Sequence, residues 1–288
     1  MITAKVICDS IAVNNIRLTT IEATLPRIIL AELRTHRQQS QEDEVSFYFC
    51  GMDEAGRELS MNSASSRAIP VEKMIEKVEK DPFVPFYWGK NQKGMQANTE
   101  LSYQEQMRAK MEWLLARNKA VQQAKALVGM GVHKQIANRL LEPFLWHTVI
   151  VTATEWSNFF AQRCHPDAQP EMRMTAEAMK AAMDASEPVV LDYGQWHLPY
   201  VSLSELNEID CWEKAKKISI ARCARVSYLT HDGVRSFEKD LELYNRLTQG
   251  GHWSPFEHVA TPMLDPLRWS GNFRGWFQAR KEHANECR

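Results

Sequence analysis

The sequence has almost no net charge, no long apolar run and no recognisable metal motif. Lysine and arginine number 35 and aspartate and glutamate 36, which gives a formal net charge of −1. A nucleic-acid polymer partner usually leaves a basic footprint, so this balance argues against one. No apolar run reaches the length of a membrane span, and the N-terminal residues lack the apolar core of a signal peptide. We therefore expect a cytoplasmic protein without a membrane partner.

The cysteines also lack a pattern. They fall at positions 8, 50, 164, 211, 223 and 287, without a C-x-x-C pair, and neither H-E-x-x-H nor a Cys/His quartet indicates zinc. We expect reduced, mostly buried thiols and no metal. The 288 residues are 44% hydrophobic and 25% charged, which is ordinary for a globular enzyme of one large domain or two modest ones.

Hydrophobic periodicity predicts an α+β fold in which a mixed or antiparallel sheet packs against long helices. Strands are expected over 3–8, 16–24, 144–152 and 259–264. Helices are expected over 24–37, 70–80, 99–128, 133–141, 155–163, 171–183, 204–226, 236–248 and 273–282. The irregular segment 184–203 is the best candidate boundary between a first part, 1–195, and a second part, 196–288. The aromatic loop 81–98 is interpreted either as a packed surface loop or as a wall for a flat ligand.

Two segments rich in cations and hydroxyls predict an anion site. The first ends a predicted helix and the second precedes Pro70, where the next helix begins; together they contain His36, Arg37, Ser40, Asn62, Ser63, Ser65, Ser66 and Arg67. Arginine offers a planar fork to phosphate, and a helix N-terminus favours negative charge. The alternative is a plain helix cap. The intervening segment 41–59 alternates like a β-hairpin, which is interpreted as a lid, a decoration or an oligomer contact.

These segments, T-H-R-Q-Q-S and N-S-A-S-S-R, resemble the signature R-H-R-x-x-S-x-N-E-x-S-x-R of flavin-dependent thymidylate synthases. Thr35 stands in place of the first arginine, and Ser63 in place of the glutamate. Further segments resemble the same family, namely R-C-A-R-V-S-Y (222–228), G-G-H-W-S-P-F-E-H (250–258), Q-I-A-N-R-L-L-E-P (135–143) and W-S-N-F-F-A-Q-R (156–163). Their order is similar to that of the longer, phage-type branch, with the two motif groups permuted.

The resemblance implies roles for individual residues. Arg163 would polarise the pyrimidine, Ser65 would orient the substrate, and His252 would lie near the folate face of the flavin. The implied flavin contacts are His36, Arg37, Asn62, Asn158, Ser227, Ser254 and Glu257. The implied nucleotide contacts are Ser65, Ser66, Arg67, Arg139, Arg163, Arg274 and Gln278.

Three positions leave questions within this resemblance. The family has a histidine shortly after the arginine matched by Arg163, whereas this register gives Asp167. Segment 273–282 looks like a second copy of the helix that ends in R-H-R, so Arg274, Gln278 and Arg280 are candidates to replace the arginine missing at Thr35. Cys164 is an alternative nucleophile.

The resemblance implies an FAD-dependent methyltransferase that converts dUMP to dTMP. Methylenetetrahydrofolate and NADPH would be co-substrates, and the protein would be a homo-oligomer with sites between subunits. The flavin and folate carry the chemistry, so the protein binds, orients and stabilises charge. Two alternatives stay open. One is flavin-dependent modification of another pyrimidine nucleotide, such as hydroxymethylation, and the other is a nucleotide-binding scaffold without flavin.

Overall fold

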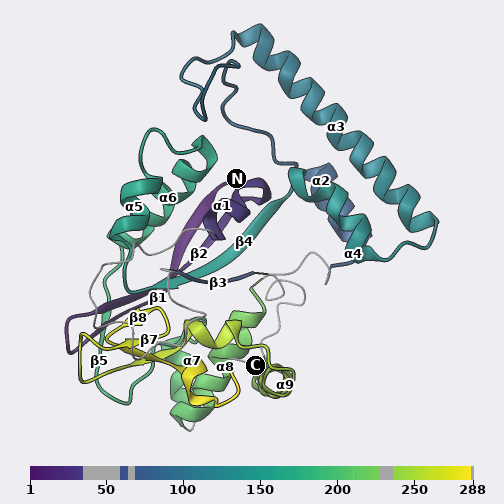
Figure 1. Cartoon of the computed structure of the whole chain (residues 1–288). Helices are drawn as coiled ribbons and strands as arrows, with labels where there is room; N and C mark the ends of the chain where they lie inside the picture. Colours follow the sequence, from purple (N-terminus) through teal and green to yellow (C-terminus); the bar gives the residue numbers. More distant parts are fainter. Residues whose placement is uncertain (35–58, 64–68, 210, 227–235, 287–288) are drawn as a thin grey trace.

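A mixed five-stranded sheet lies at the centre of the protein, with strand order β3-β4-β2-β1-β5 (Figure 1). This computed structural model describes residues 1–34, 59–63, 69–209, 211–226 and 236–286. The sheet strands are β1 (Thr3–Ala12), β2 (Arg17–Pro26), β3 (Ser60–Ser63), β4 (Trp146–Ala153) and β5 (Val189–Leu191). Only β5 is parallel to its neighbour. The predicted α+β fold is confirmed.

Helices and short strands complete the described chain. The helices are α1 (Leu30–Arg34), α2 (Val71–Lys80), α3 (Tyr103–Gly129), α4 (Lys134–Ala137), α5 (Ser157–Arg163), α6 (Pro170–Asp184), α7 (Leu203–Glu208), α8 (Trp212–Ala224) and α9 (Phe237–Gln249). The 3₁₀ segments are η1 (Arg27–Ile29), η3 (Asn138–Phe144), η4 (Ser254–His258) and η5 (Ala279–Glu282). The short strands are β6 (Ala260–Pro262), β7 (Trp269–Ser270), β8 (Phe273–Arg274) and β9 (Trp276–Gln278).

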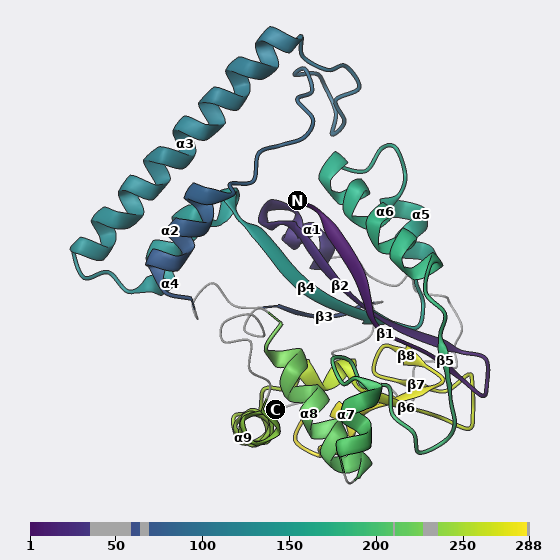
Figure 2. The same ribbon diagram turned by 180° about the vertical axis from the view of Figure 1, so that it is seen from behind.

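The sheet has a different core on each face. Alternation along β4 sends Val149 and Val151 to one face and Ile150 to the other. The two valines pack with α1, α5 and α6, whereas Ile150 packs with Tyr200 and Cys223. Figure 2 shows α5 and α6 on one side of the sheet and α7 and α8 on the other. Side chains that alternate along β3 and β4 therefore reach two separate environments.

The long helix α3 begins where its sequence predicts. Ser102 and Glu105 form a capping box, in which each side chain satisfies the backbone N–H of the other. The aromatic loop 81–98 lies beside this helix. Phe83 is fully buried and meets Trp113 and Trp146 edge-on, with ring centroids 6.2 Å and 5.4 Å apart. This mutual packing favours the packed-loop interpretation over a wall for a flat ligand.

Several predicted boundaries were wrong. The helix expected from residue 24 begins only at Arg27, because β2 continues through Pro26, which pairs with Trp146. The helix expected over 204–226 is two helices, since Ile209 adopts an extended conformation between α7 and α8. The irregular segment 184–203 contains β5, and the strand expected over 259–264 is reduced to β6. The hairpin expected over 41–59 falls almost entirely outside the described residues.

The last predicted helix, 273–282, was wrong as well. The structure has β8, β9 and η5 there. Gly275 between the two strands has φ +71°, a left-handed conformation that a helix interior does not contain. A Cβ atom at this position would lie 2.9 Å from Ile16 Cγ1. The segment therefore turns sharply against the β1–β2 hairpin instead of continuing as a helix.

Candidate functional site

Strand β3 lies between two of the segments that carry predicted flavin contacts. Asn62 of β3 donates from Nδ2 to the carbonyl oxygen of Cys223 in α8, at 2.7 Å. Ser254, the first residue of η4, donates to the carbonyl oxygen of Met61 at 3.4 Å. The first bond joins β3 to the R-C-A-R-V-S-Y segment, and the second joins it to the G-G-H-W-S-P-F-E-H segment, 161 and 193 residues apart in sequence.

Gln278 joins the same region from β9. Its side chain is 1% exposed, and Nε2 donates to Asn272 Oδ1 at 2.9 Å and to the Glu257 carbonyl oxygen at 3.4 Å. Ser60 of β3 also donates to Asn272 Oδ1, at 3.0 Å. The Glu257 carboxylate forms an ion pair with Arg280. The structure thus brings four predicted site residues together around β3: Asn62, Ser254, Glu257 and Gln278.

The glycine pair before η4 permits a tight corner. Gly251 has φ +65°, and a Cβ atom at Gly250 would lie 2.9 Å from the ring of His252. The backbone N–H of His252 donates to the Leu247 carbonyl oxygen at 2.9 Å. The ring of the predicted folate-side residue His252 therefore folds back against a position that only glycine fits.

Arg163, the predicted catalytic cation, lies on the other side of the sheet. It ends α5 and forms an ion pair with Glu32 of α1. Its Nε atom is buried and has no hydrogen-bond partner among the described residues. Asn158, in the first turn of the same helix, accepts a hydrogen bond from Gln162 at 3.0 Å. Within one chain, Arg163 is thus separated from the group around β3.

Arg274 and Arg139, two predicted nucleotide contacts, lie near opposite ends of β4. Arg274 Nε donates to Glu155 Oε1 at 2.7 Å, and its backbone N–H donates to Thr154, just beyond β4. Arg139 of η3 is half exposed and pairs with Glu142 at 2.7 Å. Both arginines therefore have carboxylate partners at the surface, one at each end of β4.

A group of cations borders the end of β3. Arg34 at the end of α1 donates from Nη2 to Ser63 Oγ at 2.9 Å. Arg27 lies 3.2 Å from Nε2 of His147. Burial, and then the charges of Arg27, Arg34 and Lys77, lower the pKa of His147 to about 3. Two arginines, Arg27 and Arg34, therefore lie near the end of β3, and Arg27 also pairs with Glu142 at 3.4 Å.

Sequence reasoning missed Arg34. Thr35 stands where the family has an arginine, and segment 273–282 was predicted to supply the replacement. Arg34 stands one position before Thr35 and contacts Ser63 of the second half of the motif. Its adjacency to the substituted position was the available signal. The remaining predicted residues lie outside the described part of the chain: His36, Arg37, Ser65, Ser66, Arg67 and Ser227.

Cys164, the alternative nucleophile, caps the C-terminus of α5 next to Arg163. Burial raises the pKa of Cys164, which weakens its case as a nucleophile. The described cysteines 8, 164, 211 and 223 are free thiols. Within the described ranges, no cluster of three or more His, Cys, Asp or Glu residues is arranged to hold a metal ion. The same part of the chain contains no helix with the length and apolarity needed to span a bilayer.

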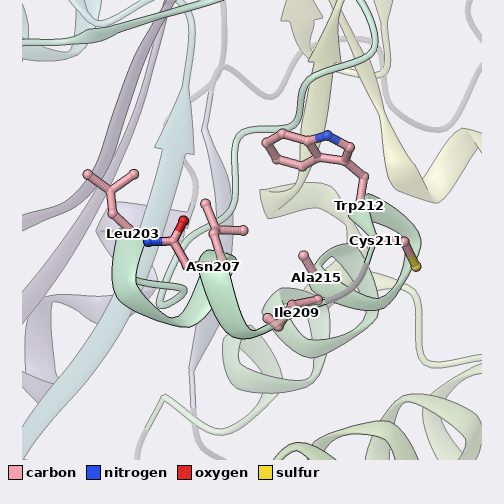
Figure 3. A pocket seen from close by; sticks show the side chains of 7 residues that line it. Leu203, Asn207, Ile209, Cys211, Trp212 and Ala215 are labelled. Carbon is pink, nitrogen blue, oxygen red and sulfur yellow. The ribbon is translucent and has the colours of Figure 1, made fainter.

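A pocket of about 560 Å³ lies between α7 and α8, away from these residues (Figure 3). Its lining is mostly apolar and comprises Leu203, Leu206, Asn207, Ile209, Cys211, Trp212 and Ala215. None of the predicted site residues lines this pocket.

A family model matches the larger part of the chain. The sequence model of the family described as thymidylate synthase complementing protein matches residues 16–189. No curated protein matches the chain in sequence. Among solved structures, the UMP/dUMP methylase PolB from Streptomyces cacaoi bound with 5-Br UMP is 14% identical, with 64% of this chain and 88% of that chain covered and a TM-score of 0.47. The same methylase with 5-Br dUMP is 18% identical, with 58% and 66% covered and a TM-score of 0.44. Because the family model spans more than half of the sequence, this chain belongs to the thymidylate synthase complementing protein family, whose motifs its sequence resembles.

Proposed function

We propose that this protein is a flavin-dependent thymidylate synthase. It converts dUMP to dTMP with FAD as cofactor and with methylenetetrahydrofolate and NADPH as co-substrates. The observation that carries the proposal is the family match over residues 16–189, together with the contacts that gather Asn62, Ser254 and Glu257 around β3. The phage-type branch stays a prediction.

The described residues fit a flavin by the chemistry of their donor set. Around β3 they offer an amide at Asn62, a hydroxyl at Ser254 and a carboxylate at Glu257, which suit the hydrogen-bonding groups of an isoalloxazine ring. Arg34 and Arg27 offer cations for a diphosphate. In this proposal Arg34 supplies the guanidinium that the family motif has at the position of Thr35. When bound, reduced flavin supplies hydride and folate supplies the one-carbon unit.

The protein's own residues bind the nucleotide and stabilise charge. Arg139 is half exposed at the surface of η3 and would contact the nucleotide phosphate, as its family counterpart is understood to do. The Arg163 guanidinium would act as a fixed donor to charge that develops on the pyrimidine. Glu32 orients the Arg163 guanidinium from α1. Such a donor in a water-poor site contributes about 3–4 kcal/mol.

The positions of these groups support a site completed between subunits. Arg163 lies with α1 on one side of the sheet, whereas Ser254 and Glu257 lie with η4 on the other. In this proposal a second copy supplies Arg163 to the group around β3 of the first. A homo-oligomer with shared sites meets this condition.

Two measurements test the proposal. A purified protein that is yellow, or that takes up added FAD and releases it on heating, is expected. A protein that binds dUMP but no flavin would contradict the proposal and favour the scaffold alternative. Mass spectrometry of the product then distinguishes dTMP from a hydroxymethylated nucleotide or from another methylated pyrimidine.

A further inference from the structure

A chain of buried polar side chains crosses the sheet beneath η4. Nε2 of His197 lies 2.8 Å from Thr20 Oγ1 of β2, which lies 2.7 Å from Thr152 Oγ1 of β4. Thr152 Oγ1 lies 2.8 Å from Nδ1 of His258, the last residue of η4. All four side chains are fully buried. We call this chain, from His197 to His258, the polar spine.

The polar spine carries no charge. Burial lowers the pKa of both His197 and His258 to about 3, and the electrostatic effect of His197 also lowers the pKa of His258. Each imidazole is therefore neutral, with one N–H and one bare nitrogen. At the far end of the spine, Nδ1 of His197 lies 2.8 Å from Ser10 Oγ and 3.4 Å from Cys8 Sγ.

When both imidazoles are neutral and each threonine donates its single hydrogen within the spine, the direction of one bond sets the direction of all the others. Each threonine hydroxyl has a single hydrogen to donate. If His197 donates from Nε2 to Thr20, then Thr20 donates to Thr152 and Thr152 donates to Nδ1 of His258. Reversing the first bond reverses all of them. The two histidines consequently share one tautomer, with both protons on Nε2 or both on Nδ1.

Both ends of the spine belong to residues 196–288, whereas its middle belongs to the central sheet. The backbone N–H of His197 donates to the Ala260 carbonyl oxygen at 2.8 Å, so both histidines attach to the chain around η4 and β6. Nε2 of His258 has no hydrogen-bond partner among the described residues. Thr152 is therefore the described polar contact through which the His258 side chain is held to the sheet.

We infer that His258 and Thr152 are positioning residues, which hold η4 against β4 so that Ser254 and Glu257 reach the cofactor. This inference rests on the proposed function, because it assumes that η4 contacts a flavin. It adds a task for two fully buried residues. Ser254 and Glu257 lie within four residues of His258 on a single 3₁₀ segment, so a displacement of His258 displaces both.

Replacing the Thr152 hydroxyl tests this inference. Thr152→Val keeps the shape of the side chain and removes the link, whereas Thr152→Ser keeps the hydroxyl. The matched control is Thr175→Val in α6, where a fully buried hydroxyl donates to the Glu171 carbonyl oxygen at 2.7 Å, away from η4. Free FAD is titrated into each purified variant, and backbone hydrogen exchange is measured across η4 and α6.

We expect Thr152→Val to weaken FAD binding at least tenfold and to speed exchange in η4, and Thr152→Ser to restore both. Thr175→Val should leave FAD binding within twofold and speed exchange in α6 alone. Equal FAD binding by Thr152→Val and the wild type would overturn the inference. A wild type that binds no FAD would instead contradict the proposed function, and the exchange in η4 would still report whether Thr152 holds this segment.

The tautomers of the two histidines give a second measurement, because they depend on the hydrogen bonds of the spine and not on packing alone. In ¹⁵N spectra of histidine-labelled protein, His197 and His258 should show the same neutral tautomer. Opposite tautomers would show that the hydrogen bonds do not run in one direction from His197 to His258, which would contradict the directed chain from which the inference is argued.

Discussion

Replacing Arg222 should cost more stability than any other single change to a charged residue near α8. Its guanidinium is fully buried and lies 2.9 Å from Asp240 and 2.8 Å from Glu205, and it donates to the Tyr200 carbonyl oxygen at 2.7 Å. Arg222→Met would leave two carboxylates and a carbonyl oxygen without their buried cation. Removing one partner of a buried pair costs about 3–5 kcal/mol.

This loss is measurable by thermal unfolding. At about 2–4 °C per kcal/mol for a chain approaching this size, Arg222→Met should lower the Tm by roughly 6–20 °C. Arg225→Met is the matched control, because Arg225 pairs with the same Asp240 but its side chain is 23% exposed. Its loss should be about 1 kcal/mol. Equal losses for the two variants, or a loss below about 1 kcal/mol for Arg222→Met, would refute the claim that burial makes the difference.

Four further predictions follow from the same contacts. Burial acts to raise the pKa of Glu205, but hydrogen bonds, led by that of Arg222, outweigh it and hold the pKa at about 2. The stabilisation that ionised Glu205 gives the folded protein is therefore fully present above the unfolded pKa of about 4.3 and should be lost as the pH falls toward 2. Unfolding followed by circular dichroism at a series of pH values would record this loss. Arg34→Gln should weaken FAD or dUMP binding about tenfold by titration, with an unchanged Tm. Arg163→Lys, which keeps the charge but loses the planar fork, should lower kcat about a hundredfold in a dTMP assay. Gly275→Ala should cost about 1–3 kcal/mol in urea unfolding, because φ is +71° and the nearest side chain would be 2.9 Å away.

Periodicity predicted the elements whose sequence carries one clear signal. Helix α2 has its buried residues on one side, and the Ser102–Glu105 capping box marks the N-terminus of α3 in the sequence. The final segment misled because its buried aromatic residues, Phe273 and Trp276, are three apart, which is also a helical spacing. The pairing of β9 with β6 and the contact of Gly275 with the β1–β2 hairpin hold this segment in its observed form, and a contact across more than 250 residues has no local signature.

In the candidate site, too, some residues were predicted from sequence motifs and others were not. The family motifs predicted Asn62, Ser254 and Glu257 as flavin contacts, and the structure brings these three residues together around β3, although their role stays a prediction. The roles of Arg34 and of the polar spine were not predicted. His197 belongs to no motif, and Thr20 and Thr152 look like ordinary strand residues until the register of β2 and β4 places them opposite one another.

The most direct test of the central claim is the formation of dTMP by the purified protein, followed by mass spectrometry. The protein is incubated with dUMP, methylenetetrahydrofolate and NADPH, with and without added FAD, after removal of any bound flavin. We predict that dTMP appears only when FAD is present. A protein that remains colourless, takes up no FAD and forms no dTMP would contradict the account, and the arginine and serine cluster would then be a plain phosphate site.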